Sequence, residues 1–403
     1  MDLIERLRRW AVARPRVLVI DAPGSASVRW TVEAELERRG WAPALSPAES
    51  DLLLVLGGSG EELAQAVDVV WSQVPAPRHR ASISTGDDVA PVLDAAVEAL
   101  AEAAGRGQPG DGGRPRPGDL LEQRGVGNHG DHGGMDHAGM DHAGMDHAGM
   151  DHAGMDHAGM DHAGMGHAGM GHGGHGGMDH SGHGGMDVAG LPMAGTAPDR
   201  DGLQLDALQV ALGPVLAGWP TGLLLHGQLQ GDVLGHVRLT WVDADTGDDR
   251  PVCTSEGTRL LALDRLNRFL EVAGWPTAAR DARRARDRLR SADPAEAAAG
   301  HRFAVQLARR VRRSRTLAWS VRGIGAVEDA GPGDLHGDVL DRVLRWCDLV
   351  AAPALPAGPL LDVPLEQVAR LLEGAELAAA RLVVASLPLS HPVARRTPVR
   401  ARG

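Results

Sequence analysis

SDLLLVLGG, at residues 50–58, decides the fold class of the first part of the chain. A short run of consecutive apolar residues closed by glycines is typical of a strand that is buried on both faces. A second run of this kind, VLVI, lies at 17–20, and helical patterns follow at 27–39 and 61–71. Strands that alternate with helices predict a parallel sheet covered by helices.

The remainder of this first part continues the alternation. Residues 79–84 are a candidate third strand, and the alanine-rich stretch 90–104 is a candidate helix. We therefore predict an α/β domain over residues 1–104, with a flavodoxin-like parallel sheet.

Residues 105–200 differ from both flanks in composition. Glycine, proline and aspartate dominate, and the pentapeptide Asp-His-Ala-Gly-Met repeats from Asp136 to Met165. Such a tract has too few apolar side chains to offset the entropy of ordering. We predict a disordered linker over 105–200.

Residues 201–403 are expected to form a second, α+β domain with a small antiparallel sheet and a helical bundle. Strand patterns at 203–212, 222–229 and 233–242 include a Gly-Asp turn at 231–232. The pattern then becomes helical, with candidate helices at 257–273, 277–290, 294–315, 337–350 and 364–372.

Charge and composition limit the function classes. The formal net charge of −12 argues against a nucleic-acid partner, since phosphate binding needs a basic surface. The charged N-terminus does not resemble a signal peptide, and no apolar run approaches the roughly 20 residues of a membrane helix. We expect a cytoplasmic chain without direct membrane insertion, with attachment to the inner face of the cell membrane through partners as an option.

Basic and aromatic residues of the second domain have simple interpretations. Lysine is absent, and an arginine run in a helical pattern is interpreted as a solvated or partner-facing surface: Arg309, Arg310, Arg312, Arg313 and Arg315. The tryptophans of this domain are interpreted as anchors of cores or interfaces: Trp219, Trp241, Trp275, Trp319 and Trp346.

Several motifs of the first domain, taken in order, resemble the small (20 kDa-type) subunit shared by complex I and [NiFe] hydrogenases. DAPGSASV at 21–28 follows the first strand, where that family has a glycine-rich cysteine loop. SDLLLVLG at 50–57 is similar to the family strand A-D-x-L-L-V-T-G. QVPAPR at 73–78 is similar to its Q-x-P-x-P-(R/K) turn, and ASISTGD at 81–87 stands at the next strand and cysteine loop.

The second domain resembles the large (49 kDa-type) catalytic subunit of the same complexes. LGP at 212–214, GLLL at 222–225 and LQGDV at 229–233 are similar to its opening hairpin. RGIG at 322–325 and GDVLDRV at 337–343 are similar to its G-D-V-x-x-R helix start. A generic α/β domain joined to a helical domain is the alternative for both regions.

The metal ligands that the resemblance implies are missing. Iron–sulfur clusters are held by cysteine thiolates, but no cysteine precedes Cys253, and Ser25 and Ser27 are poor substitutes. The nickel–iron centre needs two Cys-x-x-Cys pairs, and the only other cysteine is Cys347. The family's quinone site uses a histidine and a tyrosine, but tyrosine is absent and neither His226 nor His236 matches in position. We expect no Fe–S or Ni–Fe cofactor in the folded domains.

The linker is a candidate metal-binding tract, because imidazole, thioether and carboxylate together suit copper, while His-rich tracts also hold nickel or zinc. It resembles the Met-Asp-His repeats of copper-resistance proteins and the His-rich tails of nickel-insertion proteins. An expanded spacer without a metal role is the alternative. The candidate ligands are His132, Met135, Asp136, His137, Met140, His142, Met145, His147, Met150, His152, Met155, His157, Met160, His162, Met165, His167, Met170, His172, His175, Met178, His180 and His183.

Other candidates have a simpler structural interpretation. The loop GGSG at 57–60 could hold phosphate at a helix N-terminus, but a tight turn is favoured because the full phosphate-binding patterns are absent. The aspartates at 243, 245, 248 and 249 are interpreted as a solvated turn rather than a calcium site. His301 and His336 have no visible catalytic partner in the sequence.

Two functions remain open. The first is a non-catalytic or structural subunit of a complex I-like or energy-converting hydrogenase-related membrane complex, whose partners would include antiporter-like membrane proteins. The second is a copper- or nickel-binding or storage protein that acts through the repeat. If the chain takes part in catalysis, the resemblance implies the activity of an NADH–quinone oxidoreductase or a hydrogenase subunit.

Overall fold

The structure is a computed structural model. The described residues on both sides of the linker belong to one compact unit. All the linker metal ligands predicted above lie outside the described residues, which are 14–106, 195–198, 202–244, 252–253, 255–327, 335–353, 358–359 and 363–392.

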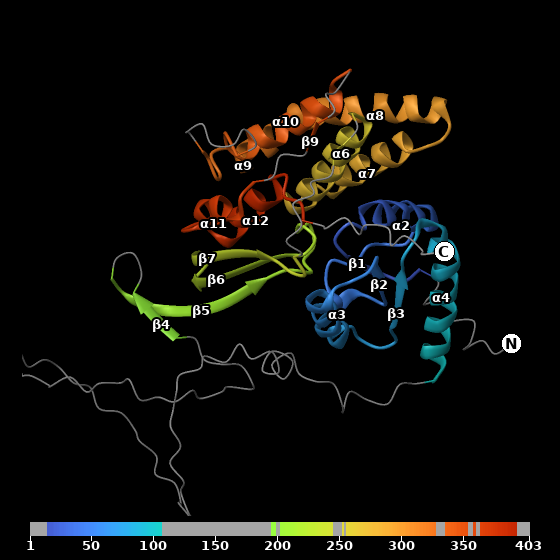
Figure 1. The fold of residues 1–403 in the computed structure, drawn as a ribbon, viewed down its shortest axis with the longest axis horizontal. Helices are drawn as coiled ribbons and strands as arrows, with labels where there is room; N and C mark the ends of the chain where they lie inside the picture. Colours follow the sequence, from blue (N-terminus) through green and yellow to red (C-terminus); the bar gives the residue numbers. More distant parts are fainter. Residues whose placement is uncertain are drawn as a thin grey trace, which may run out of the picture. The chain divides into compact units, whose positions relative to one another are not determined.

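The N-terminal region, residues 14–106, contains a three-stranded parallel sheet with helices on both faces (Figure 1). The strand order is β1-β2-β3, and Leu54, in the centre of β2, pairs with Val19 on one side and Ala81 on the other. The elements are β1 (Val17–Asp21), α2 (Ala26–Arg39), β2 (Leu52–Leu56), α3 (Glu61–Gln73), β3 (His79–Ile83) and α4 (Val89–Arg106), with short 3-10 turns at Pro47–Glu49 and Gly86–Asp88.

The apolar run of β2 explains this layered arrangement, because all five of its residues are buried. Leu52, Leu54 and Leu56 point to a core formed with residues of α2 and α4. Leu53 and Val55 point to the opposite face and pack with residues of α3. Alternate residues of one strand therefore supply two cores, as expected for a parallel sheet covered on both sides.

A short segment continues the sheet beyond β1. Gly40 ends α2 in the left-handed conformation, with φ of 69°, and the amide of Trp41 donates to the carbonyl of Leu36 at 2.9 Å. The chain then returns along β1, where Val17 forms a parallel bridge with Pro43. As a result, β1 has a neighbour on each side at its start.

The C-terminal region contains a four-stranded antiparallel sheet and a group of helices (Figure 1). The sheet order is β4-β5-β6-β7, and β8 pairs with β9 separately. The first strand lies inside the range predicted as linker, so regular structure begins before residue 201. The strands are β4 (Gly195–Pro198), β5 (Gln204–Leu212), β6 (Leu223–Gln230), β7 (Val233–Trp241), β8 (Val252–Cys253) and β9 (Gly358–Pro359).

The helices share one apolar core with the antiparallel sheet. The predicted helix over 294–315 is two helices, because the Ser314 hydroxyl accepts from the amide of Leu317 and starts a new one. None of the helices among the described residues is both long and apolar enough to cross a membrane. The helices are α6 (Ser255–Val272), α7 (Pro276–Leu289), α8 (Pro294–Arg312), α9 (Arg315–Val321), α10 (Val339–Ala351), α11 (Leu365–Leu372) and α12 (Leu377–Ala385).

Candidate functional site

A buried carboxylate, Asp264 in α6, connects the N-terminal and C-terminal regions. It accepts hydrogen bonds from Arg29 Nη2 at 2.7 Å and Trp30 Nε1 at 2.8 Å, both in α2. It also accepts from Arg286 Nη1 in α7 at 2.9 Å. Asp264 and Arg29 are each 5% exposed, and Arg286 is fully buried. One side chain thus connects α2 with the consecutive helices α6 and α7, which follow more than 200 residues later.

Further charges complete this arrangement. Arg29 donates through Nε to Asp21 Oδ2 at 3.1 Å and through Nη1 to Glu33 Oε1 at 2.7 Å. Thr221, from the C-terminal region, donates to the same Asp21 oxygen at 2.8 Å. Arg286 Nη2 lies 2.8 Å from Glu33 Oε2. We name this group the Asp264 cluster; it comprises Asp21, Arg29, Trp30, Glu33, Asp264, Arg268 and Arg286.

The electrostatics of the cluster favour the charged forms. Burial by itself raises the pKa of Asp264, but the positive charges of Arg29, Arg268 and Arg286 outweigh burial and hold that pKa well below its ordinary value. For Glu33, burial is likewise opposed by Arg29 and Arg286, and the pKa is lowered. The cluster is therefore a set of largely desolvated ions, each of which is stabilised in its charged form by the opposite charges around it.

Two helices supply the cluster through local sequence patterns. In α2, Arg29 and Glu33 are four residues apart and face the same side of the helix. In α6, the polar residues at 264, 267, 268 and 271 have the spacing of one helical face. Asp264 and Asn267 on that face are buried, because α2 and α7 cover it.

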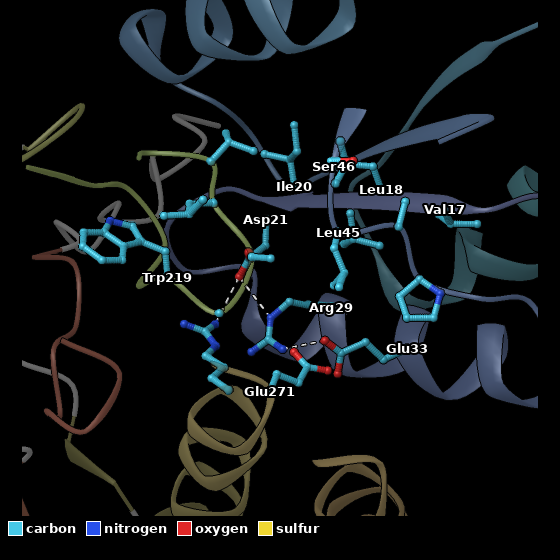
Figure 2. Close-up of a pocket in the computed structure, with 18 of the residues that line it drawn as sticks. Val17, Leu18, Ile20, Asp21, Arg29, Glu33, Leu45, Ser46, Trp219 and Glu271 are labelled. Atoms are coloured by element: carbon cyan, nitrogen blue, oxygen red, sulfur yellow. Dashed lines mark hydrogen bonds and ion pairs between the residues drawn. The ribbon is translucent and has the colours of Figure 1, made fainter. Parts of the chain in front are cut away.

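A cavity of about 340 Å³ adjoins the cluster (Figure 2). Figure 2 shows Asp21, Arg29, Glu33 and Glu271 close together, with Leu45 nearer the start of β1. The cavity is at the lower end of the sizes usual for small-molecule sites. Other lining segments are residues 43–47, residues 214–219 and the side chains of Asn267, Arg268 and Arg283.

Glu271 has an unusual place in this cavity. Burial raises the pKa of Glu271, and the nearby Arg283, with which it forms an ion pair, only partly offsets that effect. The cavity therefore combines apolar walls with a carboxyl group that binds a proton more readily than usual.

The carboxyl ends of β1 and β2 are closed by the chain itself. The Ser25 hydroxyl donates to the carbonyl of Ala22 at 2.7 Å, and Ser25 is only 6% exposed. A Cβ atom placed on Gly57 would lie 2.8 Å from the Ser25 Cβ. The two loops after these strands are thus packed directly against each other, and Gly57 permits the close approach with a φ of 80°.

The N-terminus of α3 is also occupied. Asp243 accepts from the amides of Glu62 at 2.9 Å and Leu63 at 3.0 Å, and its own amide donates to Glu62 Oε2 at 2.7 Å. A Cβ on Gly60 would lie 2.2 Å from the Asp243 carboxyl carbon, so the approach requires glycine there. The loop at 57–60 thus has a protein carboxylate at the position where a phosphate was considered, and Asp243 acts as a helix cap.

Arg342, from the GDVLDRV motif, has a structural place in the C-terminal core. It is 1% exposed and donates to the carbonyls of Gly325 at 3.1 Å, Leu335 at 3.0 Å and Gly337 at 2.9 Å, and to Ser386 Oγ at 2.9 Å. Burial lowers the pKa of Arg342 to about 10. The guanidinium thus closes the loop before α10.

The described candidate side chains lie apart. His226, His236 and His336 are exposed, and the described residues contain no group of three or more His, Cys, Asp or Glu side chains placed to hold a metal ion. Cys347 is fully buried in α10, and burial raises the pKa of its thiol to about 12, so it packs as an apolar group. Asp245, Asp248 and Asp249 lie outside the described residues.

Sequence reasoning did not find the Asp264 cluster. The α6 face with Asp264, Asn267 and Glu271 has the pattern of a solvated helix face. It is buried by tertiary contacts with α7, the next helix in the chain, and with α2, more than 200 residues away. One feature of the sequence could have indicated the cluster. In α2, the charged residues Arg29 and Glu33 lie next to Trp30, a large aromatic residue that is usually buried.

Known proteins offer no match for this arrangement. No family model, no curated protein and no solved structure matches the chain. The resemblance to complex I and hydrogenase subunits therefore depends on the quoted motifs and continues as a proposal.

Proposed function

We propose that the chain is a non-catalytic, structural subunit of a complex I-like or hydrogenase-related membrane oxidoreductase complex. The topology of the sheet supports this proposal. The segment around Pro43 bridges to β1 and can be counted as an additional strand at that edge of the sheet. From this edge to the other, the sheet then contains the Pro43 segment, β1, β2 and β3. When the four are numbered by their order along the chain, the sheet order is 2-1-3-4, which is the order of flavodoxin-like sheets.

The observation that carries the non-catalytic role is the closed carboxyl edge of this sheet. Open α/β sheets bind ligands outside the carboxyl ends of the strands, at the point where the strand order reverses, here between β1 and β2. In this chain, Ser25 packs against Gly57 at that point, and Asp243 caps α3 beside it. Side chains of the protein thus fill the place where a cofactor would be expected.

The Asp264 cluster supports a structural role for both regions. Buried ion pairs often contribute little net stability. We propose that this cluster instead favours one arrangement of the two regions over others. Its members come from α2 on one side and α6 and α7 on the other. The two regions would thus act as a permanently joined pair that presents its outer surfaces to partner subunits, including antiporter-like membrane proteins.

Purification of the tagged full chain from detergent-solubilised membranes of its native host tests this function. We expect quinone-oxidoreductase-type or hydrogenase-type subunits to co-purify in fixed ratio, with no iron or acid-labile sulfide bound to the isolated chain. A matched Asp264→Ala variant should lose these partners, because the joined arrangement is disturbed. Recovery of the wild-type chain without partner subunits, or with a bound iron–sulfur cluster, would contradict the proposal.

A second function, copper or nickel binding through the Met/His repeat, is favoured by composition. The repeat combines the thioether and imidazole ligands that suit copper. Equilibrium dialysis of the full chain and of a variant lacking residues 129–186 separates the two functions. Metal bound only by the full chain, together with loss of copper tolerance in cells carrying the deletion, would favour metal handling.

A further inference from the structure

One face of α9 combines an exposed aromatic ring with cations. Arg315, Trp319 and Arg322 are spaced at i, i+4 and i+7, so they lie on one side of the helix. Trp319 is 85% exposed, whereas Leu317 and Val321 on the other side are buried. Of the two roles expected for Trp319, that of a core anchor is wrong, because the side chain is exposed, and that of an interface anchor stays a prediction.

The sequence around this face is strongly basic. Residues 297–327 contain no Asp or Glu, in a chain whose net charge is −12. Arg310 pairs with Asp281, and Arg312 pairs with Asp348. The other arginines of the stretch are exposed and form no ion pair within the described part of the chain: Arg302, Arg309, Arg313, Arg315 and Arg322.

We propose that the exposed face of α9, formed by Arg315, Trp319 and Arg322 with the neighbouring Arg313, binds the headgroups of anionic lipids. Unpaired arginines are attracted to the negative surface of a bilayer, and each contributes about fivefold to the binding constant near that surface. Tryptophan prefers the headgroup level, where its ring is half in apolar material and its N–H remains solvated. Trp319 with an arginine one turn away on either side provides both contributions.

A lipid surface fits these residues better than an acidic protein. Trp319 stands on a seven-residue helix with 85% of its surface free, and charges lie on both sides of it. That arrangement suits a broad, uniformly charged plane into which one ring inserts, rather than a pocket with matched carboxylates. The inference depends on this surface alone and goes beyond the proposed function, which assigned membrane attachment to partners.

Vesicle sedimentation with the purified full chain tests the proposal. The probes are vesicles of phosphatidylcholine alone and vesicles with 30% phosphatidylglycerol, in about 0.1 M and about 0.5 M NaCl with EDTA present. We expect binding to the anionic vesicles only, and its loss at the higher salt concentration. Binding should persist after deletion of residues 129–186, because residues 125–193 contain no arginine.

Two variants and a charge-matched control make the test specific. The triple variant Arg313→Gln, Arg315→Gln and Arg322→Gln should bind roughly 100-fold more weakly. Trp319→Ser should weaken binding several-fold and keep the salt dependence. The control removes three exposed arginines elsewhere, at Arg14, Arg238 and Arg370, and should bind as the wild type does. Circular dichroism and the urea midpoint should be unchanged in all three, since the altered residues are exposed.

Three outcomes would overturn the proposal. The first is no binding of the wild type to anionic vesicles. The second is an equal loss of binding in the charge-matched control. The third is binding to polyglutamate, with no dependence on Trp319, in place of binding to vesicles; that result would assign the surface to an acidic protein.

Discussion

Asp264 and Arg342 are both almost fully buried charges, but their surroundings differ. Asp264 is surrounded by opposite charges, from Arg29 in the N-terminal region and Arg286 in the C-terminal region. Among the described residues, Arg342 donates only to neutral acceptors, including the carbonyls of Gly325 and Gly337. The first group connects distant segments through ions, and the second closes a local loop through dipoles.

This difference implies different consequences when each charge is removed. Loss of Asp264 would remove one of the carboxylates that neutralise the buried Arg29 and Arg286, whose other partners are Asp21, Glu33 and Asp287, and it would affect both regions. Loss of Arg342 would remove the guanidinium donor from the carbonyls of Gly325, Leu335 and Gly337, and the damage would remain near α10. The two kinds of buried charge should therefore differ in how much unfolding free energy their removal costs and in how much of the molecule is affected.

The largest effect is expected for Asp264→Ala. Removal of one partner from a buried ion pair costs about 3–5 kcal/mol, because the remaining charges stay desolvated. Urea unfolding measures the change. The control Asp281→Ala, which removes a pair with the half-exposed Arg310, should cost less than about 1 kcal/mol. Equal costs for both variants would contradict the assignment.

Arg342→Met should cost about 2–3 kcal/mol, because it leaves the carbonyls of Gly325, Leu335 and Gly337 without this donor. Hydrogen exchange should increase around residues 323–343 and remain unchanged in α2. In Asp264→Ala, by contrast, exchange should increase in α2, α6 and α7. If hydrogen exchange increased in the same segments in both variants, the distinction between the local role of Arg342 and the long-range role of Asp264 would be wrong.

Protonation of Asp264 in acid should lower the free energy of unfolding by about 1.5 kcal/mol between pH 4 and pH 2.5. The pKa of Asp264 is lowered in the folded state, so its stabilisation is present above the ordinary pKa of 3.8 and is lost as the pH falls below it. Each pH unit there is worth about 1.4 kcal/mol. The lowered pKa of Glu33 acts in the same direction, and the raised pKa values of Glu271 and Asp287 oppose it.

The comparison of wild type with Asp264→Asn isolates this carboxylate. Urea unfolding at several pH values should show the stability gap between the two proteins narrowing below about pH 4. A constant gap down to pH 2.5 would mean that the folded state does not lower the pKa of Asp264.

Asp243→Ala should have a smaller effect than the changes at Asp264 and Arg342, a loss of about 1 kcal/mol, because it removes the cap from α3. Asp243→Asn should be nearly neutral, since asparagine caps helices about as well as aspartate. Thermal unfolding of the two variants checks this. A larger loss for Asn than for Ala would exclude the capping role.

The parts of the fold that follow from local pattern could be predicted from the sequence. The apolar runs of β1 and β2 and the helices between them depend on the side chains of each segment. The break between α8 and α9 was missed, because Ser314 lies inside an arginine run that continues the helical pattern. The end of the linker was misplaced because β4 has no apolar pattern and depends on pairing with β5.

The candidate site depends on contacts that no local pattern contains. Asp264 lies on a polar helix face that would be solvated if α2 did not cover it. Asp243 is 181 residues from the helix that it caps, so a solvated turn was the natural interpretation of its sequence. Buried polar groups need partners, but the sequence does not identify partners that are distant along the chain.

Cleavage of the linker tests most directly the central claim, that the two regions are held together by the Asp264 cluster. A protease site is inserted after Arg124, and the cleaved full-length protein is analysed by size exclusion. We expect the two fragments to elute together in the wild type and to separate in Asp264→Ala. Separation of the wild-type fragments, or joint elution of both proteins to the same extent, would contradict that claim.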